Sequence, residues 1–438
     1  MLSITAYDRE NAVREMLADK VSGTLVGLWL LLPEHLRLGT WDLVRAWTGS
    51  PPVEALEPRL ALQMIHEAAL CINGVRQRRS LRQKGFETFN GLPFVATDQA
   101  IHHVLEQHTL AEAEALQLAL GKIRQARGHF PGKFVLLDPH RIRTWSQRQV
   151  QLKKTNTTMA ASKMLQTFFA IDGESAQPLA LGIGSSAVTA TQAALSLVKR
   201  VADILPGKAL WISDVEHFTT ELMTYFLTQS QFAVLMPAPQ RQNIMRQLPT
   251  MAYTRQWAGY AVAEGKYRLE AQRKTLRLLT QRTGETAQAY AYKPFVSTSK
   301  QPAADLMTLV FPERWHIEEF FNFEAALGWN RASTLNLNIR FGRMSLALLA
   351  QAAIYELRKK LPPEMKSWTA ENLARKLFNG IDGDLRVKQD TIIVTYYNAP
   401  HAEAFKERYE NLPQKLEAEG LNPKVPWLFN FKVDFRFK

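Results

Sequence analysis

The stretch KFVLLD, Lys133–Asp138, decides the fold that the sequence predicts. Upstream of it the apolar residues recur at helical spacing, whereas here an unbroken apolar run lies between two charged residues. A short run of this kind is typical of a buried strand. Asp138 closes the run and Pro139 follows, so the strand is expected to end there. From this point the chain is expected to build a sheet.

The segments that follow predict the remainder of that sheet. MLQTFFAID and PLALGIGS flank the turn DGESAQ, which predicts a hairpin over 164–185. A helix is expected over Ala190–Leu205, a second buried strand over Ala209–Asp214, and another helix over 219–230. Both buried strands therefore end in an aspartate. Open α/β sheets place their functional groups at that end of their strands.

The flanking regions differ from this middle part. Residues 1–130 have a helical pattern, and residues 232–299 hold short strand-like pieces between turn residues. The helical pattern then returns, and residues 363–438 predict a small α/β region. We expect an α/β protein with a helical N-terminal region (1–130), a central α/β domain (131–362) and a small C-terminal region (363–438).

Composition excludes several classes of protein. Of the 438 residues, 46% are apolar and 22% charged, which is ordinary for a folded soluble chain. Cys71 is the single cysteine, which excludes an intramolecular disulfide framework and a cysteine-rich zinc site and fits a reducing cytosol. The apolar runs Val21–Pro33 and Met344–Leu357 are too short to cross a bilayer, so we expect no membrane segment.

A net charge of +13 predicts a polyanionic partner, which for a cytosolic protein is usually nucleic acid. Four stretches carry much of this charge: 75–84, 140–154, 266–282 and the C-terminal FKVDFRFK. Each alone is explained by a solvated face. Together they indicate a track for DNA. From the first two stretches we select as DNA-binding candidates Arg78, Arg79, Arg82, Lys153 and Lys154.

Three carboxylates, those of Asp138, Asp214 and Glu318, indicate a metal site only when they are considered together. Alone, Asp138 suits a turn, Asp214 a helix cap and Glu318 a surface helix. Converging from distant positions, they would suit Mg²⁺, which prefers oxygen ligands. Two such ions activate an attacking oxygen and stabilise a leaving one during displacement at phosphorus.

The segment FPERWHIEEFF, 311–321, mixes aromatic and charged residues in one predicted helix. If that helix is continuous, Phe311, Arg314, Glu318 and Ala325 line one face. Glu318 would then point to the metal ions, and Arg314 one turn earlier would approach a phosphate. Glu319 lies on a different face from Arg314, so Glu318 is the acid we select.

At these residues the sequence resembles the DDE transposases of bacterial insertion sequences, and within them the group with a tyrosine–arginine–glutamate–lysine signature. Arg314, Trp315, Ile317 and Glu318 match the core of that signature, and the strands ending in Asp138 and Asp214 resemble those of the first two acids. The resemblance covers about 133–361. Phe311 stands where the signature has tyrosine, and Ala325 where it has lysine.

The resemblance implies a ribonuclease-H-like fold with a β-rich insertion before the last acid. It implies a DNA transposase that cleaves transposon ends and joins the freed 3′-hydroxyl to target DNA, with a water and then that hydroxyl as nucleophiles. It also implies Mg²⁺ (or Mn²⁺) at Asp138, Asp214 and Glu318, double-stranded DNA as partner, a homodimer on DNA, and a bacterial cytoplasmic, nucleoid-associated location. Phe311, Arg314 and Trp315 would contact DNA.

Related enzymes with a β-rich insertion stack a flipped base on an aromatic residue. Trp257 is a candidate for that role, and Tyr290 and Tyr292 are alternatives. Packing within the strand-rich insertion is the ordinary explanation of each of these rings.

Two other functions stay open at the level of sequence. A metal-dependent nuclease of the same fold would cut DNA without joining it, and a strand-transfer assay separates the two. A domesticated DNA-binding protein would keep the fold without catalysis, and an Asp138→Ala variant with unchanged DNA chemistry would favour it. The helical pattern of residues 1–130 and their basic stretch at 75–84 predict that this region recognises the element ends.

Overall fold

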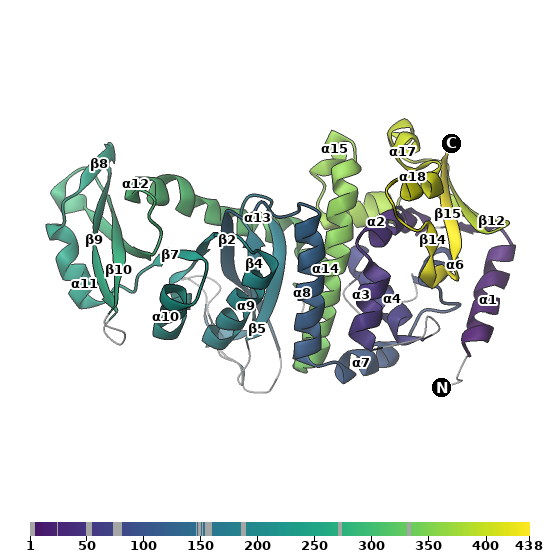
Figure 1. Ribbon diagram of the computed structural model, residues 1–438, viewed down its shortest axis with the longest axis horizontal. Coiled ribbons are helices and arrows are strands. Elements are labelled where there is room, and N and C mark those ends of the chain that lie inside the picture. Colours follow the sequence, from purple (N-terminus) through teal and green to yellow (C-terminus); the bar gives the residue numbers. More distant parts are fainter. Residues whose placement is uncertain are drawn as a thin grey trace. The chain divides into compact units, whose positions relative to one another are not determined.

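The structure is a computed structural model (Figure 1). It describes residues 5–23, 25–49, 55–72, 81–145, 147, 150, 152–153, 160–184, 190–269, 274–330 and 334–438. The chain divides into two compact units, Met1–Leu120 with Asn322–Lys438, and Gly121–Phe321. The predicted boundaries at residues 130 and 362 stay a prediction about functional regions, since the division by contacts is a different one.

The unit Gly121–Phe321 is built on one mixed sheet. Its first part has the spatial order β5–β4–β2–β6–β7. The strands are β2 (Phe134–Arg143), β4 (Ser162–Asp172), β5 (Gln177–Gly184), β6 (Leu210–Ser213) and β7 (Ala233–Pro237). β4 is antiparallel to β2 and β5, whereas β6 and β7 run parallel to β2. The predicted hairpin and both buried strands are therefore present.

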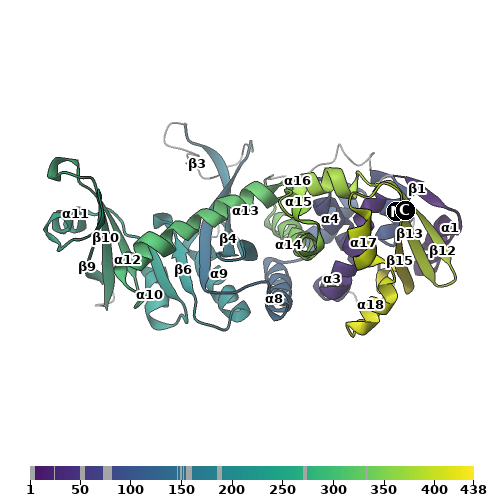
Figure 2. The same cartoon turned by 90° about the horizontal axis from the view of Figure 1, so that it is seen from above.

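Both faces of this sheet are covered, which explains why its strands are almost continuously apolar. Phe168 and Phe169 are consecutive in β4 and so point to opposite faces. Phe168 contacts His217, while Phe169 contacts Phe320 of α13 (His316–Glu324). The other helices of this part are α9 (Ala190–Ile204) and α10 (Thr220–Thr228), and Trp211 of β6 packs on Phe226 of α10. Figure 2 shows α13 along one side of the strands and α9 and α10 along the other.

β2 does not end at Asp138, as the sequence predicts, but continues to Arg143. The reason is that the two edges of β2 pair over different lengths. The carbonyl of Lys133 accepts a hydrogen bond from Leu210 on the β6 side, and backbone groups alternate sides along a strand, so Pro139 also faces the β6 side. Pairing with β6 stops at Leu137, so the missing N–H of Pro139 disrupts no ladder there. β4 continues to pair with β2 along the other edge.

The strand-rich stretch predicted over 232–299 is present, with one refinement. β7 belongs to the central ladder because it pairs in parallel with β6. The added part follows it as antiparallel strands joined to β7 through β11. Its elements are α11 (Gln242–Gln247), β8 (Thr254–Trp257), β9 (Tyr260–Leu269), β10 (Lys274–Thr283) and β11 (Ala291–Ser297).

The helical run after β11 is not a regular helix. It begins with α12 (Ala303–Asp305), passes through a π-helical turn (Leu306–Val310) and a 3₁₀ turn (Phe311–Trp315), and only then becomes α13. A second 3₁₀ turn covers Ala325–Leu327. Phe311, Arg314, Glu318 and Ala325 would share one face only on a continuous helix, but the helix changes from π to 3₁₀ at Phe311, to α at His316 and back to 3₁₀ at Ala325. Pro312, which has no N–H to donate, lies at one of these changes.

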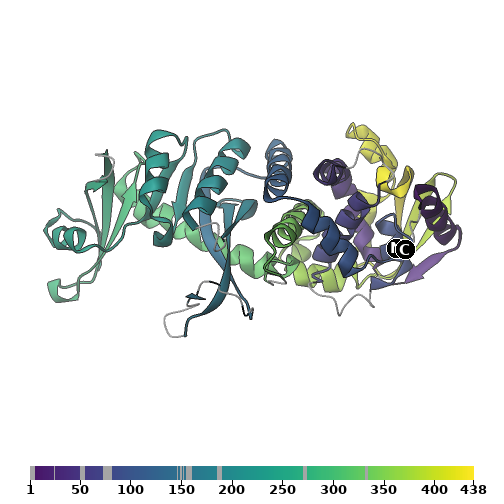
Figure 3. The ribbon, with the colours of Figure 1, turned by 90° about the horizontal axis from the view of Figure 1, so that it is seen from below.

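The other unit combines helices with a five-stranded sheet of order β1–β12–β13–β15–β14. Its strands are β1 (Val21–Gly23), β12 (Gly383–Lys388), β13 (Thr391–Tyr396), β14 (Lys424–Val425) and β15 (Phe431–Phe437). Its helices are α1 (Ala6–Ala18), α2 (Leu32–Arg37), α3 (Thr40–Thr48), α4 (Glu57–Ala69), α6 (Lys84–Phe89), α7 (Asp98–Gln107), α8 (Leu110–Ala126, which continues into the other unit), α14 (Leu337–Lys360), α15 (Pro363–Lys366), α16 (Ala370–Leu373), α17 (Ala402–Tyr409) and α18 (Leu412–Ala418). Figure 3 shows the same chain from below.

The C-terminal basic stretch FKVDFRFK is β15 rather than an open tail. Its apolar residues alternate and are buried, and Arg436 pairs with Asp434 at 2.7 Å. Lys432 lies 3.7 Å from Asp390. Half of this stretch therefore serves the core, and its two internal cations already have acidic partners. The apolar run Met344–Leu357 lies in the buried helix α14. Within the described residues, no helix has the length and apolar character needed to cross a bilayer.

Candidate active site

Asp138 and Asp214 are neighbours at the end of a parallel ladder. Leu137 and Ser213 form the last pair between β2 and β6, and each aspartate is the next residue along its strand. Because the strands are parallel, both carboxylates emerge at the same edge. Asp214 accepts a hydrogen bond of 2.7 Å from the N–H of Val215 and caps the short 3₁₀ turn Val215–His217.

The surroundings of Asp138 oppose its ionised form. Burial raises the pKa of its carboxyl to about 6, and the nearby carboxylates of Asp214 and Glu216 add to that shift. Arg314 acts in the opposite direction, with Nη1 3.1 Å from Oδ1 of Asp138. Arg141 also lowers the pKa, by a smaller amount. A carboxylate held this way is stabilised by any further cation that reaches it.

Glu216 is a member of this site that the sequence analysis missed. Both of its carboxylate oxygens accept from one guanidinium nitrogen of Arg141, at 2.7 and 2.8 Å. The ion pair fastens the turn after Asp214 to the C-terminal part of β2. The sequence did hold a signal, because Glu216 follows Asp214 by two residues in WISDVEHF. The site thus contains three carboxylates and two arginines.

Glu318 lies on α13, which packs against the face of the sheet that carries Asp138. Phe321 stacks on His140 with ring centroids 4.4 Å apart, and His140 lies two residues beyond Asp138 on the same face of β2. Glu318 is one helical turn before Phe321 and so lies on the side of α13 that faces β2. Glu319 is exposed.

The structure brings Asp138, Asp214, Glu216 and Arg314 together, and it places Glu318 on the helix that packs over the same face of β2. Across the described ranges, no three His, Cys, Asp or Glu side chains are close enough to hold one metal ion.

The predicted DNA-binding residues differ in their surroundings. Arg314 is paired with Asp138, and Trp315 is 61% exposed beside it in sequence. The ring of Phe311 packs edge-on against Phe295 at 4.7 Å, and Lys293 lies over it at 5.3 Å. Phe311 therefore has a packing role that needs no hydroxyl.

The aromatic candidates in the insertion differ in exposure and in the groups that they contact. Trp257 is 53% exposed and stacks on Tyr260 at 4.4 Å, which leaves its other side open. Tyr290 lies against the guanidinium of Arg282 at 4.1 Å, and its ring contacts Tyr292.

Most of the basic candidates near the N-terminus and in the β2–β4 connection lie outside the residues that the structure describes. Arg82 is exposed, in the unit that does not contain the acid pair. Lys153 is in β3 (Leu152–Lys153), which pairs with β4. Arg78, Arg79 and Lys154 lie outside the described residues.

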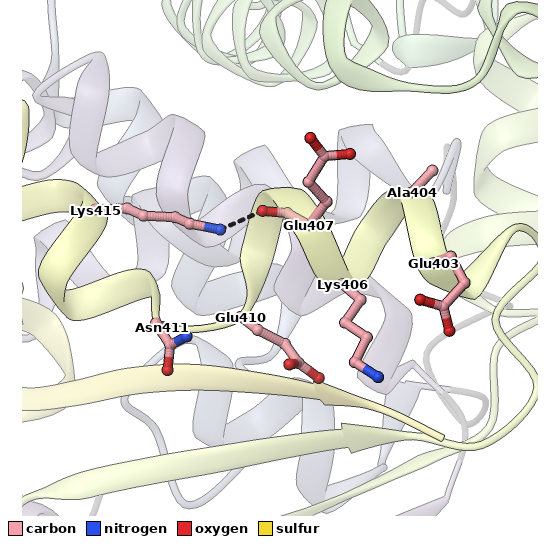
Figure 4. Close-up of a pocket in the computed structure, with 7 residues that line it drawn as sticks. All are labelled: Glu403, Ala404, Lys406, Glu407, Glu410, Asn411 and Lys415. Atoms are coloured by element: carbon pink, nitrogen blue, oxygen red, sulfur yellow. Dashed lines mark hydrogen bonds between the residues drawn. The ribbon is translucent and has the colours of Figure 1, made fainter.

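A large pocket of about 700 Å³ lies on α17 and α18 and holds none of the predicted site residues. Figure 4 shows three glutamates and two lysines around it, with Lys415 donating to the backbone carbonyl of Glu407. Acids and bases are mixed there, so this pocket has no strong preference for either sign of charge.

The fold and site define a mixed α/β protein with acidic residues at the edge of a parallel ladder. A family model described as the transposase DDE domain matches residues 129–352, slightly more than half of the chain. The chain belongs to this family and is a DDE-type DNA transposase. The matched residues include Asp138, Asp214 and Glu318.

One solved structure that the chain resembles is the cryo-EM structure of a piggyBac transposase synaptic complex with hairpin DNA. The identity is 9%, the match covers 82% of each chain, and the TM-score is 0.41. No curated protein matches this sequence.

Proposed function

We propose that this transposase cleaves the ends of a DNA element and transfers the freed 3′-hydroxyl strand into target DNA, with Asp138, Asp214 and Glu318 as the catalytic acids. The observation that carries the proposal is the pair of aspartates side by side on β2 and β6, with the pKa of Asp138 raised. The five strands lie in the order β5–β4–β2–β6–β7, and β4 is the one that runs antiparallel to the other four. This arrangement supports a ribonuclease-H-like core.

The residues of the site fit Mg²⁺, with Mn²⁺ as a substitute. Carboxylate oxygens are the ligands both ions prefer, and a divalent cation would relieve the repulsion of Asp138 by the carboxylates of Asp214 and Glu216. Asp138 and Asp214 would hold the ions, and Glu318 would complete the set. When bound, such ions activate the attacking oxygen and stabilise the leaving oxygen during in-line displacement at phosphorus.

Arg314 has two successive partners in this proposal. Its guanidinium now neutralises Asp138 through one nitrogen, Nη1. A divalent cation at Asp138 would replace that charge, and the planar guanidinium would then be released to bind a DNA phosphate through two N–H groups. Arg141 stays with Glu216 and keeps the turn after Asp214 against β2.

Asp138→Asn tests the proposal most directly. The variant keeps the size of the side chain but loses the charge that holds the metal ion, so cleavage of element ends should fall by about 10³-fold or more. Binding of the same DNA without divalent metal should remain. Cleavage at the wild-type rate would contradict the proposal, and cleavage without joining by the wild type would assign a nuclease instead.

Glu318 and Glu319 provide a matched pair for the third acid. We expect Glu318→Gln to lose cleavage to a similar degree as Asp138→Asn, and Glu319→Gln, on the exposed side of the same helix, to keep it. Equal activity of both variants would exclude Glu318 as a catalytic residue.

Double-stranded DNA, a homodimer on paired ends and a cytoplasmic, nucleoid-associated location complete the proposed function. The net charge of +13 supports the DNA partner. The mass of the complex with end DNA, measured by light scattering, tests the dimer. Deletion of residues 1–130 should abolish the preference for ends, and a truncated protein that still prefers ends would contradict end recognition by that region.

A further inference from the structure

A second charged site lies in the unit Gly121–Phe321, apart from the acid pair. It is a pocket of about 330 Å³ between β9, α11 and the start of α10. Figures 1 and 2 show α11 beside the strands of the insertion. Three cationic side chains line it, Arg241, Lys266 and Arg268, and the described lining includes no acidic residue.

These three cations have no acidic partner in the described part of the chain. Arg277 provides the contrast. It stands opposite Lys266 in the β9–β10 register, but its guanidinium is held by both oxygens of Glu264 at 2.7 and 2.8 Å. The insertion thus neutralises Arg277 and leaves the cations that line the pocket available to an anion.

The remaining lining supplies neutral hydrogen-bond donors. Asn243 and Gln247 lie on α11 with amide groups, and Thr220 is the first residue of α10. Charged and neutral donors combined in a concave site, without acids, favour a phosphate ligand.

The spacing of the cations favours a chain of phosphates over a single one. Lys266 and Arg268 are two residues apart in β9 and lie on its exposed side, while Tyr267 between them is buried. Alternate residues of a strand are roughly 7 Å apart. That interval is comparable to the separation of neighbouring phosphates along one DNA strand. A volume of about 330 Å³ accommodates part of one strand but not a duplex.

The pocket is connected to the acid pair by a short segment. Phe218 lines it and follows Asp214 by four residues. The ring of Phe218 meets that of Tyr267 edge-on, with centroids 5.7 Å apart. A strand of DNA held on β9 would therefore be anchored to the same short segment that carries Asp214.

We propose that Arg241, Lys266 and Arg268 bind consecutive backbone phosphates of one DNA strand and so fix that strand beside the acid site. The proposal depends on the proposed function for DNA as the partner, and it adds a site to it. Inorganic phosphate and nucleoside triphosphates share the same chemistry, so the experiment must separate them from a DNA strand.

The test is the salt dependence of DNA binding by the full chain, measured by fluorescence anisotropy without divalent metal. The variant is Lys266→Gln with Arg268→Gln. The matched control is Arg246→Gln, an exposed arginine on α11 that does not line the pocket. Each lost phosphate contact lowers the log–log salt slope by about 0.9 on duplex and about 0.7 on single-stranded DNA. We expect the double variant to lose about 1.8 on duplex and about 1.4 on a single strand, and the control to lose nothing.

An unchanged slope in the double variant overturns the proposal, and so does an equal loss in Arg246→Gln. Competition by millimolar inorganic phosphate or ATP, with DNA binding unaffected by the double variant, would assign the pocket to a small phosphate ligand and also overturn it. Because binding is measured without metal and without cleavage, a failure of Asp138→Asn to alter cleavage would contradict the proposed function and leave this result untouched.

Discussion

The carboxylates of Glu34 and Asp138 are held in opposite ways. Glu34, in the unit that contains both termini, is fully buried. Lys360 donates to it at 2.5 Å, Arg37 at 3.2 Å, and the hydroxyl of Tyr409 lies 3.4 Å away. One acid therefore faces two cations and a hydroxyl. Arg37 also pairs with Glu419 at 2.7 Å, which brings the local charge close to balance.

Asp138 has the opposite balance. It shares its surroundings with Asp214 and Glu216, against Arg314 and Arg141. Its side chain keeps 23% exposure, so a solute can reach it. A structural acid is thus neutralised within the protein, whereas the acid of the candidate site is left short of positive charge.

The largest effect on stability is expected at Glu34. Glu34→Gln would leave Lys360 and Arg37 without their buried counter-charge, and breaking a buried pair typically costs about 3–5 kcal/mol of unfolding free energy. Chemical denaturation of the variant measures this cost. Glu407→Gln, an exposed glutamate on α17, is the control and should change little. A neutral result at Glu34 would erase the distinction between the two acids.

Metal protection should distinguish the two sites next. At a Mg²⁺ concentration one hundred times the dissociation constant, the native state gains about 2.7 kcal/mol. We expect this gain in the wild type and its loss in Asp138→Asn, as followed by thermal unfolding with and without the ion. Equal protection of Asp138→Asn would place the ion elsewhere.

Without metal, Asp138→Asn should be more stable than the wild type at neutral pH. The pKa of Asp138 rises from 3.8 to about 6 on folding, so the folded state binds its proton more tightly and stability falls as pH rises through this range. A shift of that size corresponds to at most about 3 kcal/mol. Because the side chain is partly exposed and Arg314 loses a charged partner, we expect about 1–2 kcal/mol.

That gain should be complete above about pH 6 and absent below about pH 4. Urea unfolding of both proteins across this range measures it. A gain that persists at pH 4 would have a cause other than the charge of Asp138.

The smallest effect is expected from Arg314→Gln. Without its guanidinium the pKa of Asp138 should rise further, and the interval in which stability falls should move to higher pH. The same urea series on this variant reports the shift. An unchanged pH range would mean that Arg314 does not act on Asp138 in solution.

Sequence alone predicted the strands well because their apolar runs have one explanation. The strands β4, β5 and β6 are buried on both faces, and continuous apolar sequence is the direct record of that burial. The extension of β2 beyond Pro139 was missed because the sequence does not state which edge of a strand stays unpaired. The basic stretch at the C-terminus was selected for its charges, and the alternation of its apolar residues, which marks the buried strand β15, was not used.

The residues of the candidate site were also predicted where the signal was local and missed where it depended on distant parts of the chain. Asp138 and Asp214 were found because each closes an apolar run, which is a local signal. Glu216 was missed because its partner, Arg141, is 75 residues away in the chain. The assumed continuity of the helix through Arg314 and Glu318 failed because π and 3₁₀ turns depend on packing that no single residue announces.

Pro139 limits the backbone pairing between β2 and the chain that follows β6, next to the two aspartates. Any other residue at position 139 would offer a backbone N–H on the β6 side, and the pairing of the two strands could then continue beyond Ser213. With a ring in its place, the chain after Ser213 finds no donor and turns away at Val215. The parallel ladder therefore ends at the pair Leu137 and Ser213, so the backbone beside Asp138 and Asp214 is not joined across β2 and β6.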